Sequence, residues 1–379
     1  MRILIAPNAF KDSLDASDAA AAIREGLESS MLNCTAECFP IADGGDGTAK
    51  LIIEKFKGKI VETEVGDPLG KKIRARFGLI DRGETAVIEM ADSSGIRLLN
   101  RLELNPLRAN SYGTGEMIIA ALDCEVKKII IGLGGSATID GGAGLLHALG
   151  VRFLDSIGNE LKPCPEDLSA LADIDLSGID QRVFNCKVIV LCDVANYLLG
   201  PDGAAAVFGP QKGATLSEII RLEDVLQKIS AIASAGGLAD MSAIKHGGAA
   251  GGTAAALKVF LNAELVDGAF KFLEMTNFGN SLRSCDLLIT GEGSIDEQTL
   301  QGKAPFAAAA AAKYLGIPVV GIAGKLPLEA NPALNEYFQV LIPLSNEPSD
   351  LETAISHTRS NLIRTGRMLG NLFSIGKFK

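Results

Sequence analysis

Glycine-rich segments follow short apolar runs at several points of this 379-residue chain, which contains 42 glycines. One spans residues 132–144, follows the apolar run 128–131 and precedes a helical pattern at 145–149. A strand, a glycine turn and a helix start can direct several backbone N–H groups at an anion, and the helix dipole adds to the attraction. This order of elements predicts an α/β fold with anion or sugar-acid binding at this segment.

Short apolar runs followed by amphipathic stretches predict strand–helix units in the first and last parts of the chain. The strand-like runs lie at 3–6, 36–40, 287–290, 319–322 and 340–343, and helical patterns begin near Ser17, Gln301, Asn331 and Asp350. Five such strands suit a flavodoxin-like doubly wound parallel sheet, whose ligands bind at the carboxyl ends of the strands. The loops that follow the strands should therefore share one edge.

The middle of the chain has a different pattern. Runs at 61–65, 72–80 and 85–90 predict a β-meander, and a helix at 113–122 and strands at 128–131 and 187–191 follow. A chain of this length can form about two domains. We expect a discontinuous flavodoxin-like α/β domain of residues 1–57 and 258–379, split by an inserted mixed α/β domain of residues 58–257, with the active site in the cleft between them.

The charge balance favours a small-molecule partner. The chain carries 46 acidic and 36 basic residues, a formal net charge of -10, which argues against a nucleic-acid or membrane partner. Seven cysteines without a CxxC pair indicate neither a disulfide framework nor a tight zinc site. Because a strand-like run begins at Arg2, without a leader before it, we expect a cytoplasmic protein. The oligomeric state stays open, a homo-oligomer included.

Two further glycine-rich loops carry carboxylates. In residues 41–48, Asp43 and Asp46 are candidate ligands of Mg²⁺, which prefers hard oxygen atoms. The alternative is that Asp46 or Thr48 caps the following helix. In residues 286–296, Glu292 and Asp296 are candidates for a metal or nucleotide contact, with a turn and a helix cap as the alternative.

Asp193 and two lysines are the other candidates for chemistry. Asp193 follows an apolar strand, where a desolvated carboxylate can take a proton from a substrate hydroxyl; the alternative is an Asx turn. Lys212 lies on a loop that disfavours regular structure, and Lys11 lies on the loop after the first strand. Both lysines suit a phosphate or carboxylate group, since an acidic protein needs local cations to bind anions.

The histidines and Ser136 carry weaker signals. His147, His246 and His357 lack metal-ligand spacing, so we interpret them as structural. Ser136 lacks the Gly-x-Ser-x-Gly frame of a nucleophile elbow, which gives a hydrolase little support.

Six segments together resemble the class I glycerate kinases of bacteria: 6–14, 42–48, 132–138, 208–213, 247–252 and 290–296. In order and spacing they cover nearly the whole chain. The resemblance implies an ATP-dependent kinase that uses Mg²⁺ and phosphorylates D-glycerate, usually to 2-phosphoglycerate, with 3-phosphoglycerate as the other product. Small departures occur at Asp46, where glutamate is commoner in the family, and at Ile139, where a polar residue is usual.

Phosphoryl transfer mainly requires positioning and charge neutralisation. Our hypothesis is that Asp193 orients or deprotonates the attacking hydroxyl, while Lys11 and Lys212 neutralise charge. The metal candidates are Asp43, Glu292 and Asp296. The expected contacts to glycerate or nucleotide are Asn8, Ser13, Gly44, Gly45, Gly47, Thr48, Gly134, Gly135, Ser136, Asp140, Gly291 and Gly293. Hinges for domain closure are expected near residues 57–59 and 247–252.

Two other functions are compatible with parts of the pattern. A nucleotide-dependent dehydrogenase needs a Gly-x-Gly-x-x-Gly turn. Gly132 and Gly134 begin that frame, but Ala137 stands at its end and no acidic residue follows at the required place. A non-catalytic sugar-acid binding protein would bind glycerate without consuming ATP.

Overall fold

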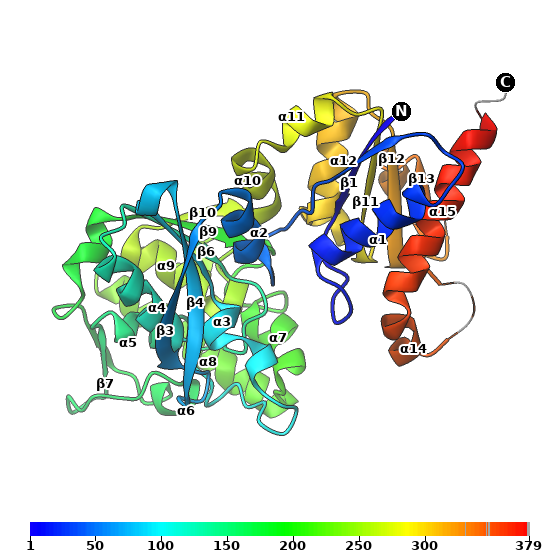
Figure 1. Cartoon of the computed structure of the whole chain (residues 1–379). Coiled ribbons are helices and arrows are strands. Elements are labelled where there is room, and N and C mark those ends of the chain that lie inside the picture. The colour runs from blue at the N-terminus through cyan, green and yellow to red at the C-terminus, as the bar shows by residue number, and fades with distance from the viewer. Residues whose placement is uncertain (330, 346, 348, 377–379) are drawn as a thin grey trace. The chain divides into compact units, whose positions relative to one another are not determined.

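The computed structural model describes residues 1–329, 331–345, 347 and 349–376 (Figure 1). The chain has a mixed α/β fold and divides into two compact units. The first consists of Met1–Asp43 and Ala269–Lys379, and the second is the continuous stretch Gly44–Gly268. The first unit is therefore discontinuous in sequence, and each unit has a sheet and a core of its own.

Within the described residues, the first unit holds a five-stranded parallel sheet. Its strands are β1 (Arg2–Pro7), β2 (Thr35–Cys38), β11 (Leu287–Ser294), β12 (Val319–Lys325) and β13 (Val340–Pro343), in the spatial order β13-β12-β11-β1-β2. Counted along this unit the order is 2-1-3-4-5, that of flavodoxin-like sheets. All five strand-like runs of the sequence are strands, and β11 and β12 extend further than predicted.

Within the described residues, seven helices belong to this part of the chain. They are α1 (Ala16–Glu28), α10 (Gly268–Met275), α11 (Phe278–Arg283), α12 (Ala304–Tyr314), α13 (Pro332–Asn335), α14 (Leu351–Ser356) and α15 (Thr358–Gly376). Helices α1 and α15 lie side by side (Figure 1). A Cβ on Gly26 of α1 would collide with the carbonyl oxygen of Ile363 in α15, so only glycine permits this close approach.

The second unit holds a six-stranded mixed sheet within the described residues. Its strands are β3 (Lys59–Gly66), β4 (Lys72–Ile80), β5 (Thr85–Glu89), β6 (Lys128–Gly132), β9 (Lys187–Cys192) and β10 (Glu264–Asp267), in the order β10-β9-β6-β5-β4-β3. The first three strands form the predicted antiparallel meander, and β5, β6, β9 and β10 are parallel. The carboxyl ends of β5, β6 and β9 therefore meet at one edge.

Helices and a small antiparallel sheet complete the second unit. The helices are α2 (Thr48–Lys55), α3 (Ala91–Ser94), α4 (Tyr112–Asp123), α5 (Ala143–Ala148), α6 (Pro165–Leu168), α7 (Ala204–Phe208), α8 (Leu216–Ala235) and α9 (Thr253–Leu261), and the small sheet pairs β7 (Arg152–Leu154) with β8 (Asp173–Asp175). The sequence patterns did not predict α8, although it begins with a complete capping box between Thr215 and Glu218.

The boundaries between the units differ from the predicted ones. The chain passes between them at Asp43–Gly44 and Gly268–Ala269, not near residues 57 and 258. The reason is packing: α2 contacts β4 and β5, and α9 buries Phe260 and Leu261 in the core of the second unit. The predicted hinge segments 57–59 and 247–252 consequently lie inside the second unit.

No described helix has both the length and the apolar character needed to cross a membrane.

Candidate active site

Carboxylates gather at the carboxyl ends of β1 and β11 in the first unit. The side chain of Asn8 donates from Nδ2 to Oδ2 of Asp43 over 3.0 Å. Thr299 Oγ1 donates to Oε1 of Glu292 over 3.0 Å, and Ser294 Oγ donates to Oδ2 of Asp296 over 3.0 Å. Three of the predicted site carboxylates are thus held in place by neighbouring amide or hydroxyl groups.

Glu292 is the buried member of this group, with 7% of its surface exposed. Burial, which is the largest cause, and the negative charges of Asp43 and Asp296 together raise the pKa of its carboxyl group to about 7. The positive charge of Lys303 and the hydrogen bond from Thr299 oppose this rise. A buried carboxyl group with a raised pKa at the ligand-binding edge of a sheet is typical of functional sites. Burial makes its negative charge unfavourable in the folded protein, and a bound cation or substrate can compensate for that cost.

The raised pKa of Glu292 predicts a pH-dependent gain in stability on its removal. Between about pH 4.5 and 7 the folded protein binds more protons than the unfolded chain, so Glu292 lowers stability as the pH rises. We expect Glu292→Gln to raise Tm at pH 8 in metal-free buffer, by the equivalent of about 3 kcal/mol. Near pH 4 the two proteins should melt alike, as measured by calorimetry.

The exposed Glu297 provides the control for this experiment, because it lies in the same loop. Glu297→Gln should leave the pH dependence of Tm unchanged. Equal Tm differences for Glu292→Gln at pH 4 and pH 8 would contradict the assignment of a raised pKa to Glu292.

The described residues contain no group of three or more acidic, histidine or cysteine side chains that could by itself hold a metal ion. Asp43, Glu292 and Asp296 therefore do not form a complete metal centre of the kind that Ca²⁺ or Zn²⁺ occupies. Mg²⁺ commonly binds through one or two carboxylates together with substrate phosphates and water. The carboxylates of the first unit fit that mode, in which the phosphates complete the coordination.

The loop after β1 carries the other candidates of the first unit. Lys11 is exposed, and its backbone nitrogen lies 3.7 Å from the position that a Cβ on Gly293 would occupy. Ser13 Oγ donates to the carbonyl oxygen of Ile355 over 2.7 Å, which ties the loop to α14. A Cβ on Gly291 would collide with the carbonyl oxygen of Ile322, so this glycine is required by the neighbouring strand rather than by a ligand.

In the second unit, two glycine loops touch through their backbones. The N–H of Gly134 donates to the carbonyl oxygen of Gly44 over 3.0 Å, and a Cβ on Gly134 would collide with the Cα of Gly45. Gly44 has a φ of 95° and packs on the carbonyl of Leu191. These glycines let the loops after Asp43 and after β6 meet at the carboxyl end of the sheet.

Asp193 lies directly beside this contact. One of its carboxylate oxygens is 3.2 Å from the position of a Cβ on Gly134. Its charge also reaches Lys212, where it favours the protonated ammonium group. Lys212 donates from Nζ to Ser136 Oγ over 2.8 Å. The structure therefore brings together Gly134, Ser136, Asp193 and Lys212, four of the residues singled out from the sequence.

The environment of Lys212 corrects one expectation. The glycine- and proline-rich segment suggested a lysine presented on a loop, but only 3% of its surface is exposed. Its Nζ donates to the carbonyl oxygen of Thr138 as well as to Ser136. Burial lowers the pKa of its ammonium group to about 8, and the charges of Asp140 and Asp193 limit this fall. Lys212 thus acts on the loop after β6 from inside the protein.

Asp140 and Thr48 have structural partners where ligand contacts were predicted. Asp140 is fully buried and accepts from the backbone N–H and hydroxyl of Ser111 and from the N–H groups of Gly142 and Gly144. Thr48 Oγ1 donates to the carbonyl oxygen of Gly45. Both side chains stabilise the conformation of the loops, because their oxygen atoms form hydrogen bonds with groups of the protein itself.

Glu89 was not singled out from the sequence. It ends β5 and accepts from the N–H groups of Gly47 and Ala49 over 2.7 and 3.0 Å. Glu89 therefore caps α2, a role for which Asp46 or Thr48 was the alternative considered from the sequence. Burial raises the pKa of Glu89, and Asp46 raises it further. Arg97 forms an ion pair of 2.6 Å with Asp46. The sequence feature that could have singled out Glu89 is its position at the end of the predicted strand 85–90.

Glycine loops at strand ends, with local lysines and carboxylates on an α/β fold, are typical of an enzyme that acts on anionic phosphorylated substrates. Comparisons with known proteins agree. A model of the glycerate kinase family matches residues 3–374. The chain therefore belongs to the glycerate kinase family and is a kinase.

Individual relatives match over their full length. The glycerate kinase of Bacillus subtilis (strain 168) is 42% identical over 377 residues, which cover 100% of this chain and 99% of the relative. The glycerate 2-kinase of Escherichia coli (strain K12) is 39% identical over 376 residues, 99% of each chain. The crystal structure of a putative glycerate kinase 2 from Salmonella typhimurium LT2 has a TM-score of 0.82 and 40% identity, with 100% of both chains covered.

Proposed function

We propose that this chain transfers the terminal phosphoryl group of ATP to D-glycerate, forming 2-phosphoglycerate and ADP. Membership of the glycerate kinase family supports the reaction class and the substrate. The choice of the 2-hydroxyl is supported by the relative from Escherichia coli, which is named a glycerate 2-kinase. Family membership also argues against a nucleotide-dependent dehydrogenase and against a non-catalytic binding protein.

The observation that carries the proposal is the placement of Asp193 beside the backbone of Gly134, within the electrostatic reach of Lys212. A carboxylate at a strand end can orient the attacking hydroxyl or take its proton. The N–H of Gly134 is bonded to the carbonyl oxygen of Gly44, so Gly134 contributes close packing of the loops at this position. Lys212 holds Ser136 and adds positive potential from the interior. It is thus a positioning residue rather than a surface contact to phosphate.

The first unit supplies a second set of groups in this proposal. Exposed Lys11 neutralises charge on the phosphoryl group or the substrate carboxylate, and Asn8 orients Asp43. Asp43, Glu292 and Asp296 are the residues that would hold Mg²⁺ together with the phosphates. The metal, when bound, neutralises charge on the transferred group.

An assay of ADP release with D-glycerate and ATP tests the proposal. We expect release that depends on D-glycerate and on added Mg²⁺. Binding of glycerate without ADP release would instead support the non-catalytic binding protein. Phosphorus and proton NMR of the product distinguishes 2-phosphoglycerate from 3-phosphoglycerate, and a product phosphorylated at the 3-hydroxyl would contradict the proposed position. A cytoplasmic location stays a prediction, and the oligomeric state stays open.

We also propose that both units act on the same pair of substrates and that the active site closes on them. Closure would exclude water, which otherwise competes for the phosphoryl group. Because the chain passes between the units at Asp43–Gly44 and Gly268–Ala269, we expect the hinge there. Small-angle scattering should show a smaller radius of gyration with ATP–Mg²⁺ and glycerate together than with either alone. An unchanged radius would contradict closure.

A further inference from the structure

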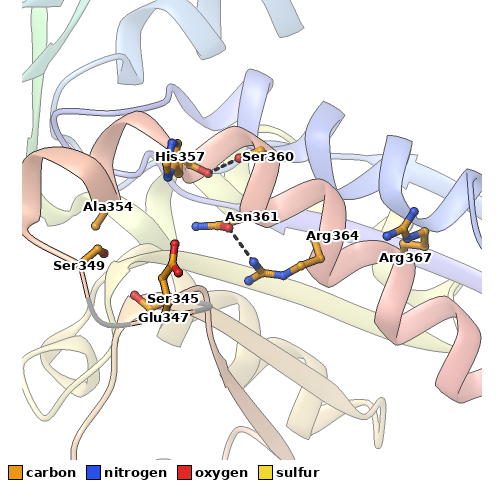
Figure 2. A pocket seen from close by; sticks show the side chains of 9 residues that line it. All are labelled: Ser345, Glu347, Ser349, Ala354, His357, Ser360, Asn361, Arg364 and Arg367. Atoms are coloured by element: carbon orange, nitrogen blue, oxygen red, sulfur yellow. Dashed lines mark hydrogen bonds between the residues drawn. The ribbon is translucent and has the colours of Figure 1, made fainter.

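A cavity of about 460 Å³, lined mainly by residues with polar or charged side chains, lies within the first unit, between the segment that follows β13 and helices α14 and α15 (Figure 2). Ser345 and Ser349 line it from the segment, and His357, Ser360, Arg364 and Arg367 line it from the helices. None of these residues belongs to the carboxylate group at the ends of β1 and β11. The cavity is at the end of the edge strand β13, whereas Glu292 lies in the central strand β11.

Arg364 is held in a fixed orientation in the wall of this cavity. One of its terminal nitrogens donates to Asn361 Oδ1 over 2.8 Å, and the other donates to the carbonyl oxygen of Leu344 over 2.7 Å. Figure 2 shows the first of these bonds. Two of five N–H groups are used in these bonds, and the described part of the chain provides no further partner for the guanidinium. A guanidinium fixed in this way loses little entropy when it binds a ligand.

The other donors around the cavity have no competing ion pairs. Within the described residues, neither the ring of His357 nor the guanidinium of Arg367 makes a hydrogen bond or an ion pair. Glu347 is the one acidic residue among those that line the cavity. Two arginines and three serines therefore line the cavity with one carboxylate, in a chain whose formal net charge is -10. This local excess of positive charge would attract an anion. The hydroxyl of Ser360 donates to the carbonyl oxygen of His357, so it offers a ligand its acceptor lone pair or must turn to donate.

We propose that this cavity binds the phosphate group of a small phosphorylated metabolite at a site separate from the active site. A phosphate offers more acceptor atoms and more charge than a carboxylate, which suits two guanidiniums, hydroxyls and an imidazole. The volume suits a metabolite, since small-molecule pockets span about 300–1,000 Å³. The site adjoins the active-site loop: Ser13 of that loop bonds to Ile355, which lies in α14 between the lining residues Ala354 and His357.

Calorimetric titration of the full-length protein with inorganic phosphate and with 2-phosphoglycerate tests the proposal, in the presence of a saturating non-hydrolysable ATP analogue and glycerate. We expect both phosphates to bind, and the double variant His357→Gln/Arg367→Gln to weaken their binding about 10-fold. This variant is chosen over a change of Arg364, whose bonds support the end of β13. The control is Arg359→Gln, on the same helix, because Arg359 pairs with Glu25 outside the cavity.

Three results would overturn the proposal. Equal binding by the double variant and the wild type would show that the cavity is not the phosphate site. Loss of binding whenever the ATP analogue is present would assign the cavity to the nucleotide of the active site. An equal weakening by Arg359→Gln would show a general charge effect. Because the titration measures binding and not turnover, it stands independently of the proposed reaction.

Discussion

Replacing Asp193 with asparagine should lower kcat by about 10²- to 10⁴-fold while the protein stays folded, which is the range that a general base contributes. Asparagine keeps the shape of the side chain and can still orient a hydroxyl, but it cannot accept the proton. Asp193 lies at the end of β9 beside Gly134. Steady-state kinetics with D-glycerate, together with circular dichroism and Tm, provides the measurement.

The exposed Asp202 is a matched control in the same unit. Asp202→Asn should leave kcat within about twofold of the wild type, since its exposed side chain lies outside the loops 41–48 and 132–144. Near-normal turnover of Asp193→Asn would remove Asp193 from the mechanism. A loss of Tm as large as that of a core variant would instead give Asp193 a structural role.

The second large effect concerns Lys212 and pH. Because burial lowers its pKa to about 8, the ammonium group loses its charge as the pH rises through that value. We expect kcat to fall along an alkaline limb centred near pH 8. Lys212→Met should lower kcat at pH 7 by about 10²-fold, the cost of a small misplacement of reacting groups, because Ser136 loses the bond that positions it. Its remaining activity should lack the alkaline limb.

The pH dependence of Tm tests separately whether the pKa of Lys212 is lowered in the folded protein. Between about pH 8 and 10.5 the unfolded chain binds more protons at Lys212 than the folded protein, so this group makes the wild type more stable as the pH rises. Lys212→Met lacks this gain, and its Tm relative to the wild type should fall across that window. An alkaline limb that survives in Lys212→Met would show that another group titrates there.

Strand positions and chemistry-bearing loops follow from the sequence because they depend on neighbouring residues. Strand β4 spans Lys72–Ile80 and β13 spans Val340–Pro343, as their apolar patterns predict. Asp193 lies at the end of a buried strand for the same reason, since the apolar run stops at Cys192. The sequence showed that these loops are rich in glycine, but it did not predict that Gly134 contacts Gly44 and Gly45.

Burial and protonation depend on residues far apart in the chain, and only the tertiary structure decides them. Lys212 and Ser136 are separated by 76 positions, and no local pattern shows that the lysine enters the protein to reach the serine. Glu89 caps a helix that begins about 40 residues earlier, at the loop around Gly47. The chain passes between the units after Asp43, because α2 packs on β4 and β5 and therefore belongs to the second unit, although the sequence pattern assigned it to the first. Local periodicity therefore determined the elements of this protein, while long-range packing set the charge states and partners of its candidate catalytic groups.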